Sequence, residues 1–422
     1  MKQMGCLLIC LALVWTIMGA AMGEDFVPAL DTEADYTLTV QGSYSNFEAL
    51  EAAFDAFRQF YPRAELQYQR LDDYSSAISA ALSGDKAPDI YFAYDWMRSW
   101  EDYAVPMEKA EDLGDEKLGL ALEVYRPAQL HRTEGEKTAI APIFATTCGM
   151  LVNLDIFRKA GLSVPTDWAS LAEACEKLKE AGYSSLMLGY SGDTEMFSSI
   201  VMPYFLASLV NHPEAAAQMN AMAEGAGEYM RPALEMEQRL LDSGYLNLKA
   251  CAEIPDNYQG VILRFFEGDV PMMVANGDIV SGTGKRESRS EAFRKNPFSY
   301  AFCPLPAADE GCWFYDQTSF GFAVNSESKN LEIANEFMRF LISFEQLNNM
   351  ARAKCMLSPT ADLSFSGIYA PFNEIPADRI VTAAEFGLSD AVMTQVRNAA
   401  FQLAKGMSVD EAIAAYGTLD SK

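Results

Sequence analysis

The sequence that decides the fold is YTLTVQGSYSNFEALEAAFDAF, residues 36–57, in which a β-rich segment passes directly into a helical pattern. Its opening residues, Tyr36–Val40, predict a first strand. Apolar residues then recur at helical spacing over 47–61 and predict a helix. Ser45, followed three residues later by Glu48, predicts a capping box at the start of that helix.

Three further segments continue this alternation toward the C-terminus. Residues 64–69 alternate strictly between apolar and polar side chains, which is typical of a half-buried strand. Residues 73–82 predict a short helix, and the apolar run 90–93 predicts a third strand. Strands that alternate with helices in this way indicate a parallel sheet with helices packed on its faces.

The same rhythm returns later in the chain. Asn153 is placed to cap a short helix that runs through Phe157. We also expect helices at 166–182, 233–241 and 331–341, and strands at 185–188, 269–274 and 320–324. The fold class is therefore α/β, with two sheets in two lobes.

Length and charge narrow the function. A chain of 422 residues suggests two or three domains. The hydrophobic fraction of 50% and the charged fraction of 22% are those of a globular protein. The net charge of −27 would repel a phosphate backbone, so we expect no nucleic-acid partner.

The first 23 residues read as a signal peptide. Lys2 is their only charge, and small residues at Ala21 and Gly23 fit a signal-peptidase site before Glu24. The alternative is an uncleaved membrane anchor, because residues 5–23 are uncharged and nearly long enough to span a bilayer. We therefore expect an exported protein, periplasmic or extracellular, associated with the outer face of the cytoplasmic membrane.

Export would place the later cysteines in an oxidising compartment. They are too few for a disulfide scaffold, and none forms a Cys-x-x-Cys zinc pair. Cys303 and Cys312 could meet across a loop, although buried free thiols are an equal alternative. We expect neither a metal nor a cofactor.

Motifs for catalysis are missing or incomplete. The two histidines, His131 and His212, are not spaced as metal ligands, and we expect both at the surface. The segment Gly189–Gly192 has its second glycine one residue too early for a nucleophile elbow. A pair of carboxylates for glycoside hydrolysis stays possible, because 59 acidic residues always supply a pair.

Several segments carry a family resemblance when they are read in order. They are Phe57–Pro62, Ser83–Ile90, Leu151–Leu162, Pro165–Trp168, Phe266–Met272, Pro304–Pro306, Gly321–Ser326 and Ala334–Leu341. Together, over about residues 36–360, they resemble the extracellular solute-binding proteins of ABC importers, in the subgroup that carries carbohydrates. The sequence departs from that family in three places: Val152 replaces a tyrosine, residues 275–278 lack an aromatic side chain, and the lipidation cysteine is missing.

The resemblance implies the two-lobed periplasmic-binding-protein fold of type II, with two discontinuous α/β domains, a hinge and a cleft between the lobes. After the signal peptide (1–23) and an N-terminal leader (24–35), lobe 1 would comprise 36–143 plus 307–355. Lobe 2 would comprise 144–303 plus 356–422. The chain would cross between the lobes near 142–146, 303–306 and 354–359.

Candidate ligand contacts follow from the ends of the predicted strands, where open α/β sheets bind ligands. Sugars need aromatic rings for their C–H faces and fixed carboxylates or amides for their hydroxyls. Residues 94–96, directly after a strand, supply both. The candidates are Ser43, Tyr44, Tyr94, Asp95, Trp96, Phe144, Tyr190, Asp193, Asn276, Asp278, Trp313, Tyr315 and Asp316.

The resemblance implies a non-enzymatic monomer that captures a sugar or oligosaccharide by hinge closure and delivers it to ABC permease subunits. A secreted carbohydrate-active hydrolase and a ligand-sensing receptor component are the alternatives. Because no Arg or Lys lies at the candidate strand ends, a strongly anionic ligand is less expected. Arg98, Arg126 and Arg264 keep that possibility open.

Overall fold

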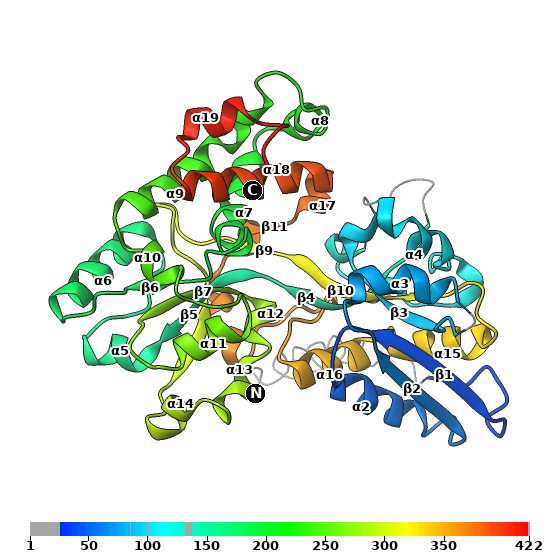
Figure 1. Cartoon of the computed structure of the whole chain (residues 1–422). Coiled ribbons are helices and arrows are strands. Elements are labelled where there is room, and N and C mark those ends of the chain that lie inside the picture. Colours follow the sequence, from blue (N-terminus) through cyan, green and yellow to red (C-terminus); the bar gives the residue numbers. More distant parts are fainter. Residues whose placement is uncertain (1–25, 85, 99–100, 131–136, 421–422) are drawn as a thin grey trace, which may run out of the picture.

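Two lobes lie side by side, joined by extended strands, in the computed structural model (Figure 1). The structure describes residues 26–84, 86–98, 101–130 and 137–420. The predicted signal peptide and His131 lie outside these residues. Within them, no helix has the length and apolar character needed to cross a membrane.

The sheet of the first lobe has five strands in the order β2-β1-β3-β10-β4. Strand β1 is parallel to β2 and β3, whereas β10 is antiparallel to β3 and β4. The strands are β1 Tyr36–Gly42, β2 Ala64–Arg70, β3 Ile90–Ala93, β4 Ala141–Thr146 and β10 Gln317–Val324. The three strands expected in the first hundred residues are confirmed, as is the parallel arrangement among them.

Helices α2 Glu48–Phe57, α3 Tyr74–Leu82, α4 Ala104–Lys109, α15 Leu331–Leu341 and α16 Phe344–Lys354 belong to the same lobe. The predicted capping box is wrong, because Phe47 is the N-cap residue of α2 and no side chain caps that helix. Phe47 is only 1% exposed and packs against Tyr44 and Phe92. Burial of this ring sets the start of the helix in place of a side-chain cap.

The sheet of the second lobe has four strands in the order β6-β7-β5-β8. These are β5 Cys148–Asn153, β6 Met187–Leu188, β7 Met272–Asn276 and β8 Tyr300–Cys303; β9 Phe314–Tyr315 and β11 Ile380–Val381 form a separate pair. Asn153 caps the helix after β5, as predicted, by accepting hydrogen bonds from the amides of Asp155 and Ile156.

The helices of the second lobe are α5 Leu154–Lys159, α6 Trp168–Glu180, α7 Glu195–Leu209, α8 Ala215–Asn220, α9 Arg231–Asp242, α10 Leu248–Cys251, α11 Gln259–Phe265, α12 Gly277–Val280, α13 Thr283–Glu287, α14 Glu291–Lys295, α17 Ala383–Phe386, α18 Asp390–Ala404 and α19 Val409–Ala414. Helix α18 packs against α7 and α9, so the C-terminal part of the chain completes this lobe (Figure 1).

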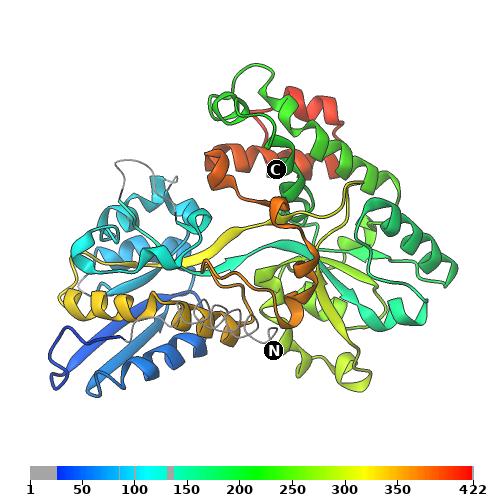
Figure 2. The ribbon, with the colours of Figure 1, turned by 180° about the vertical axis from the view of Figure 1, so that it is seen from behind.

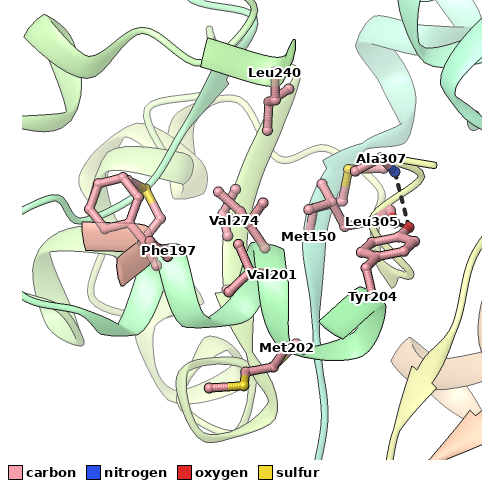
Figure 3. Close-up of a cluster of buried hydrophobic side chains, with 14 of the residues drawn as sticks. Met150, Phe197, Val201, Met202, Tyr204, Leu240, Val274, Leu305 and Ala307 are labelled. Carbon is pink, nitrogen blue, oxygen red and sulfur yellow. Dashed lines mark hydrogen bonds between the residues drawn. The ribbon is translucent and has the colours of Figure 1, made fainter. Parts of the chain in front are cut away.

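Each lobe has its own hydrophobic core. The first core contains buried side chains from Leu38 to Phe144 and from Phe320 to Met356. The second contains those from Ala145 to Tyr315 and from Leu357 onward. Figure 3 shows part of the second core, where Met150, Val201 and Leu240 pack together. Each lobe is thus built from segments that are distant in the sequence.

The chain passes between the cores three times, and Figure 2 shows β4 and β10 running between the lobes. The first passage lies between Phe144 and Ala145, and the last lies between Met356 and Leu357. The middle one lies after Tyr315, because residues 307–315 still pack in the second core. The hydroxyl of Tyr204 anchors this segment: it donates to the carbonyl of Leu305 and accepts a hydrogen bond from the amide of Ala307 (Figure 3).

The cysteines within the described residues are free thiols, including Cys303 and Cys312. The alternative of unpaired thiols therefore holds for these two residues. Burial raises the pKa of both to about 12. Such thiols stay protonated and unreactive at neutral pH.

Candidate functional site

Three aromatic side chains gather where β1 and β3 end, and we call Tyr44, Tyr94 and Trp96 the aromatic ledge. The rings of Tyr94 and Trp96 stack with centroids 5.4 Å apart and an interplanar angle of 17°. Tyr44 lies edge-on to Phe320 at 5.4 Å, and the Tyr94 ring lies 6.1 Å from the same phenylalanine. All three ledge residues are half-buried, so each ring keeps an accessible part.

Hydrogen bonds hold the ledge in place. The hydroxyls of Ser43 and Tyr94 lie 3.3 Å apart, and Tyr68 donates to the backbone carbonyl of Tyr44 at 2.9 Å. Ser43, Tyr44, Tyr94 and Trp96, all predicted from their positions after strands, are therefore brought together. Asp95 begins the 3-10 helix η1 Asp95–Arg98, and its side chain lies outside the part of the chain that the structure describes.

The second lobe contributes Asp278, on α12 directly after β7. Its Oδ1 accepts a hydrogen bond of 2.5 Å from the hydroxyl of Ser319 on β10. The next residue on β10, Phe320, contacts Tyr44, so one dipeptide joins the ledge to Asp278. Burial raises the pKa of Asp278, and the hydrogen bond from Ser319 opposes that rise. The pKa values of Tyr44 and Tyr94 are raised by burial and additionally by the Asp278 charge.

Two cations border the same region. The Nζ atom of Lys354, at the end of α16, lies 4.3 Å from the centre of the Tyr44 ring. The guanidinium of Arg286, on α13, lies 4.8 Å from the centre of the Tyr258 ring. The two cations lie within electrostatic reach of each other, because the pKa of Lys354 is lowered first by burial and then by the charges of Lys285 and Arg286.

Three more predicted residues lie at strand ends of the second lobe. Asp193 accepts hydrogen bonds from Asn257 at 3.2 and 3.3 Å and from the amide of Glu195. Asn276 caps α12 by accepting from the amide of Ile279, so its carbonyl oxygen serves the helix. Tyr190 is half-buried, and its hydroxyl lies over Gly192.

Four predicted residues lie away from the ledge. Phe144 is 0% exposed and packs against Phe320 in the first core, so we assign it to hinge packing. Asp316 is 1% exposed, and Arg126 and Gln129 occupy its oxygens at 2.6–2.8 Å. Both corrections have the same physical reason, which is that no surface is left for a ligand in this conformation.

Trp313 and Tyr315 belong to the neighbourhood of the β9–β11 pair. Trp313 lies 5.9 Å from the guanidinium of Arg379, and Tyr315 pairs with Val381. The strand after them, β10, is one of the two strands that run between the lobes. These two aromatic side chains therefore belong to the second core and its border.

Sequence reasoning missed Ser319, Tyr258, Arg286 and Lys354. Lys354 is the first residue of the predicted third crossing between the lobes. That position could have identified it as a candidate ligand contact. Ser319 lies directly before the predicted strand 320–324, close to the candidates 313–316 that were chosen instead. Tyr258 and Arg286 follow no strand, and nothing in their local sequence distinguishes them.

The arrangement suits binding more than chemistry. Aromatic rings offer an apolar face, Asp278 and Ser319 offer hydrogen-bonding oxygens, and Lys354 and Arg286 offer donors. Within the described residues, no cluster of His, Cys, Asp or Glu side chains is arranged to hold a metal ion. The ledge lies in one lobe and Asp278 in the other, so a ligand that touches both would connect them.

Comparison with known proteins adds the family. A model of the family described as "Bacterial extracellular solute-binding protein" matches residues 41–346. Among the curated proteins compared, none matches the chain.

Solved structures match the whole architecture. A family 1 extracellular solute-binding protein from Bifidobacterium longum subsp. infantis is 18% identical to this chain, with a TM-score of 0.65. The match covers 91% of this chain and 98% of that protein's chain. RafE from Streptococcus pneumoniae in its apo form is 14% identical, with a TM-score of 0.66 and coverage of 92% and 98%. The sugar-binding protein MalE from Xanthomonas citri is 14% identical, with a TM-score of 0.65 and coverage of 89% and 94%.

These similarities establish the fold. It is the two-lobed α/β fold of periplasmic binding proteins, as the alternation of strands and helices and the family resemblance predicted.

Proposed function

The chain belongs to the family of bacterial extracellular solute-binding proteins, and from this premise we propose that it captures a saccharide between its lobes for an ABC importer. Members of this family are the solute-binding components of such importers and are non-enzymatic binding proteins. The predicted absence of enzymatic activity agrees with this membership. Membership of this family also argues against the alternative of a carbohydrate-active hydrolase.

The observation that carries the saccharide proposal is the aromatic ledge beside Asp278. Tyr94 and Trp96 are partly exposed aromatic residues, and exposed aromatic rings suit the C–H face of a pyranose ring. The hydroxyl of Ser319 is hydrogen-bonded to the carboxylate of Asp278. Phe320, the next residue along the strand, contacts Tyr44 of the ledge. Rings on one side and fixed acceptors on the other are the two kinds of partner that a sugar needs.

Relatives with the same fold support this ligand class. One solved structure is RafE in complex with raffinose, and another is a chitin oligosaccharide binding protein. Their sequence identities of 15% and 16% leave the choice of sugar to this chain's own residues.

Binding would couple to movement of the lobes. Periplasmic binding proteins close their two lobes around a ligand by a hinge motion. A ligand seated on the ledge and on Asp278 favours the conformation in which both are in reach, because it gains contacts only there. The closed form would then dock on the permease subunits as an exported monomer.

A thermal-shift screen of the purified chain against neutral and acidic mono- and oligosaccharides tests the proposal. We expect a raised melting temperature with one saccharide class, 1:1 stoichiometry in calorimetry, and unchanged saccharide in mass spectra after incubation. Failure of every saccharide to stabilise the chain would contradict the ligand class. Recovery of a cleaved product would contradict the binding role.

A further inference from the structure

Lys354 and Arg286 have no acidic partner among the described residues of a strongly acidic protein. The chain has 59 acidic and 32 basic residues, so partners are abundant. Arg126, Arg231 and Arg264 each pair with carboxylates at 2.6–2.9 Å. Among the residues that the structure describes, neither Lys354 nor Arg286 has such an ion pair within 4.0 Å.

Arg286 is the more buried of the two, with 9% of its surface exposed. Its Nε atom is buried and has no hydrogen-bond partner in the described part of the chain. The guanidinium lies against the Tyr258 ring at 4.8 Å, which supplies cation–π attraction but satisfies no N–H group. A buried donor without a partner is costly, so a group that accepts from it stabilises the site.

Lys354 is half-buried over the Tyr44 ring at 4.3 Å. Lys354 is the last residue of α16, where the helix dipole stabilises a positive charge. Burial lowers the pKa of Lys354, and the charges of Lys285 and Arg286 lower it further. The opposing influence of Glu48 and Asp278 is smaller than that of the two cations.

The nearby carboxylates do not neutralise this pair. Asp278 accepts the hydrogen bond from Ser319, and it forms no ion pair with Lys354 within 4.0 Å. Glu287, beside Arg286 in the sequence, accepts a hydrogen bond from the hydroxyl of Tyr300 at 2.7 Å. Lys354 over Tyr44 and Arg286 over Tyr258 are therefore cations that no carboxylate of the described residues pairs with.

Asp256 is a further acid whose charge is felt at Arg286. Its Oδ1 accepts hydrogen bonds from the amides of Tyr258 and Gly260, both at 3.0 Å, and these bonds lower its pKa more than the Arg286 charge does. Asp256 therefore serves the start of α11 and leaves the guanidinium of Arg286 without a direct partner.

We infer that the ligand is an acidic saccharide whose carboxylate or phosphate group is held by Lys354 and Arg286. This inference rests on the proposed function and names its substrate class. The guanidinium fork donates to two oxygens of such a group, and the ammonium adds a point charge. Tyr44 then contacts the sugar ring that carries the anion, while the stacked pair Tyr94 and Trp96 contacts a further ring.

The structure changes the expectation for an anionic ligand. Sequence reasoning looked for a cation directly after a strand and considered Arg126 and Arg264. Both of these are engaged by carboxylates, Arg126 by Asp316 and Arg264 by Asp269. The unpaired cations lie instead near the ends of two helices. Lys354 is the last residue of α16, and Arg286 lies in the last turn of α13 in the second lobe.

Matched pairs of ligands test the inference by calorimetry. One arm uses trigalacturonate against its fully methyl-esterified form, and xylotriose against xylotriose bearing a glucuronate branch. The other arm uses maltose against maltose 6′-phosphate, which separates a phosphate from a carboxylate source. We expect one acidic saccharide to bind at least about ten-fold more tightly than its neutral counterpart, because charge-assisted hydrogen bonds are lost with the anion.

Variants assign the effect to the two cations. Lys354→Met and Arg286→Gln are expected to lower the affinity for the acidic saccharide about ten-fold or more, and to change that for the neutral counterpart less than about three-fold. Lys354→Arg keeps the charge and is expected to retain most of the preference. Lys295→Met, at an exposed ion pair on α14, is the matched control, and thermal melts verify that each variant is folded.

The outcomes separate the inference from the function on which it rests. If neutral saccharides bind as well as acidic ones, or if the variants weaken both equally, the inference is overturned and the saccharide receptor stands. If no saccharide of either kind binds, both are overturned.

Discussion

The hydroxyl of Ser319 donates a 2.5 Å hydrogen bond to Oδ1 of Asp278, and this bond connects a strand that crosses between the lobes to a helix of the second lobe. The neighbouring Phe320 packs against Tyr44 in the first core. One crossing strand thus contacts both Asp278 and the aromatic ledge. Fixed acceptors of this kind lower the entropy that binding must overcome.

We predict that binding of a neutral saccharide through Asp278 weakens as the pH falls. The pKa of Asp278 is raised above its ordinary value of 3.8 by burial, so its carboxylate takes up a proton earlier than an exposed one. The protonated form is a poorer acceptor for sugar hydroxyls. Calorimetry at pH 7.5, 6.0 and 5.0 is expected to show falling affinity toward acid in the unaltered chain and weaker, flatter binding in Asp278→Asn. An equally steep pH dependence in that variant would assign the effect to another group.

We predict that Trp96→Ala weakens saccharide affinity about ten-fold, because it removes one ring of the stacked pair with Tyr94. The melting temperature is expected to change little, since the ring is only half-buried. Trp168→Ala is the matched control. That tryptophan lies under the guanidinium of Arg239 on a separate groove, at 4.2 Å. Equal loss of affinity in both variants would show that the ledge is not the contact surface.

We predict that Asp316→Ala destabilises the fold by about 3–5 kcal/mol, because it leaves the guanidinium of Arg126 buried without its partner. Arg126 also donates to the carbonyls of Ser358 and Thr360, so the same guanidinium binds the segment that follows the third crossing. Asp309→Ala, which removes an exposed partner of Arg239, is expected to cost less than about 1 kcal/mol. Urea denaturation measures both. Similar effects for the two variants would refute the structural role of Asp316.

We predict that Glu237→Gln stabilises the protein increasingly as the pH rises. Glu237 is 0% exposed, and neither carboxylate oxygen has a hydrogen-bond partner among the described residues. Burial raises its pKa well above the ordinary value of 4.5, so the folded state keeps a proton that the unfolded state releases. The free energy of unfolding therefore falls above about pH 4.5, by up to about 1.4 kcal/mol per pH unit.

Denaturation of Glu237→Gln and the unaltered chain at pH 4.5, 6.0 and 7.5 measures this difference. Glu235→Gln, exposed on the same helix, is the control. A stability difference that stays constant with pH would mean that Glu237 is not buried as a neutral acid.

Local sequence patterns predicted the parts of the fold that depend on neighbouring residues. Strict alternation located β2, and Asn153 caps its helix because an N-cap needs only the amides two and three residues ahead. The capping box at Ser45 failed because burial of Phe47, a tertiary contact, outweighed a local hydrogen bond.

The sequence predicted only those site residues whose position depends on neighbouring residues in the chain. Tyr44 and Tyr94 follow β1 and β3, which are parallel neighbours, and the ends of such strands meet at one edge of the sheet. Asp316 was misassigned because its partner Arg126 lies 190 residues away in the sequence. The contact between Lys354 and Tyr44 likewise depends on the return of α16 to the first lobe, which no local pattern records.

Hydrogen–deuterium exchange, with and without the saccharide that the screen identifies, tests most directly whether the ligand lies between the two lobes. The account predicts that binding protects peptides containing Tyr44 and Trp96 in one lobe and a peptide containing Asp278 in the other. Protection confined to a single lobe, or to the separate groove at Trp168 and Arg239, would contradict it.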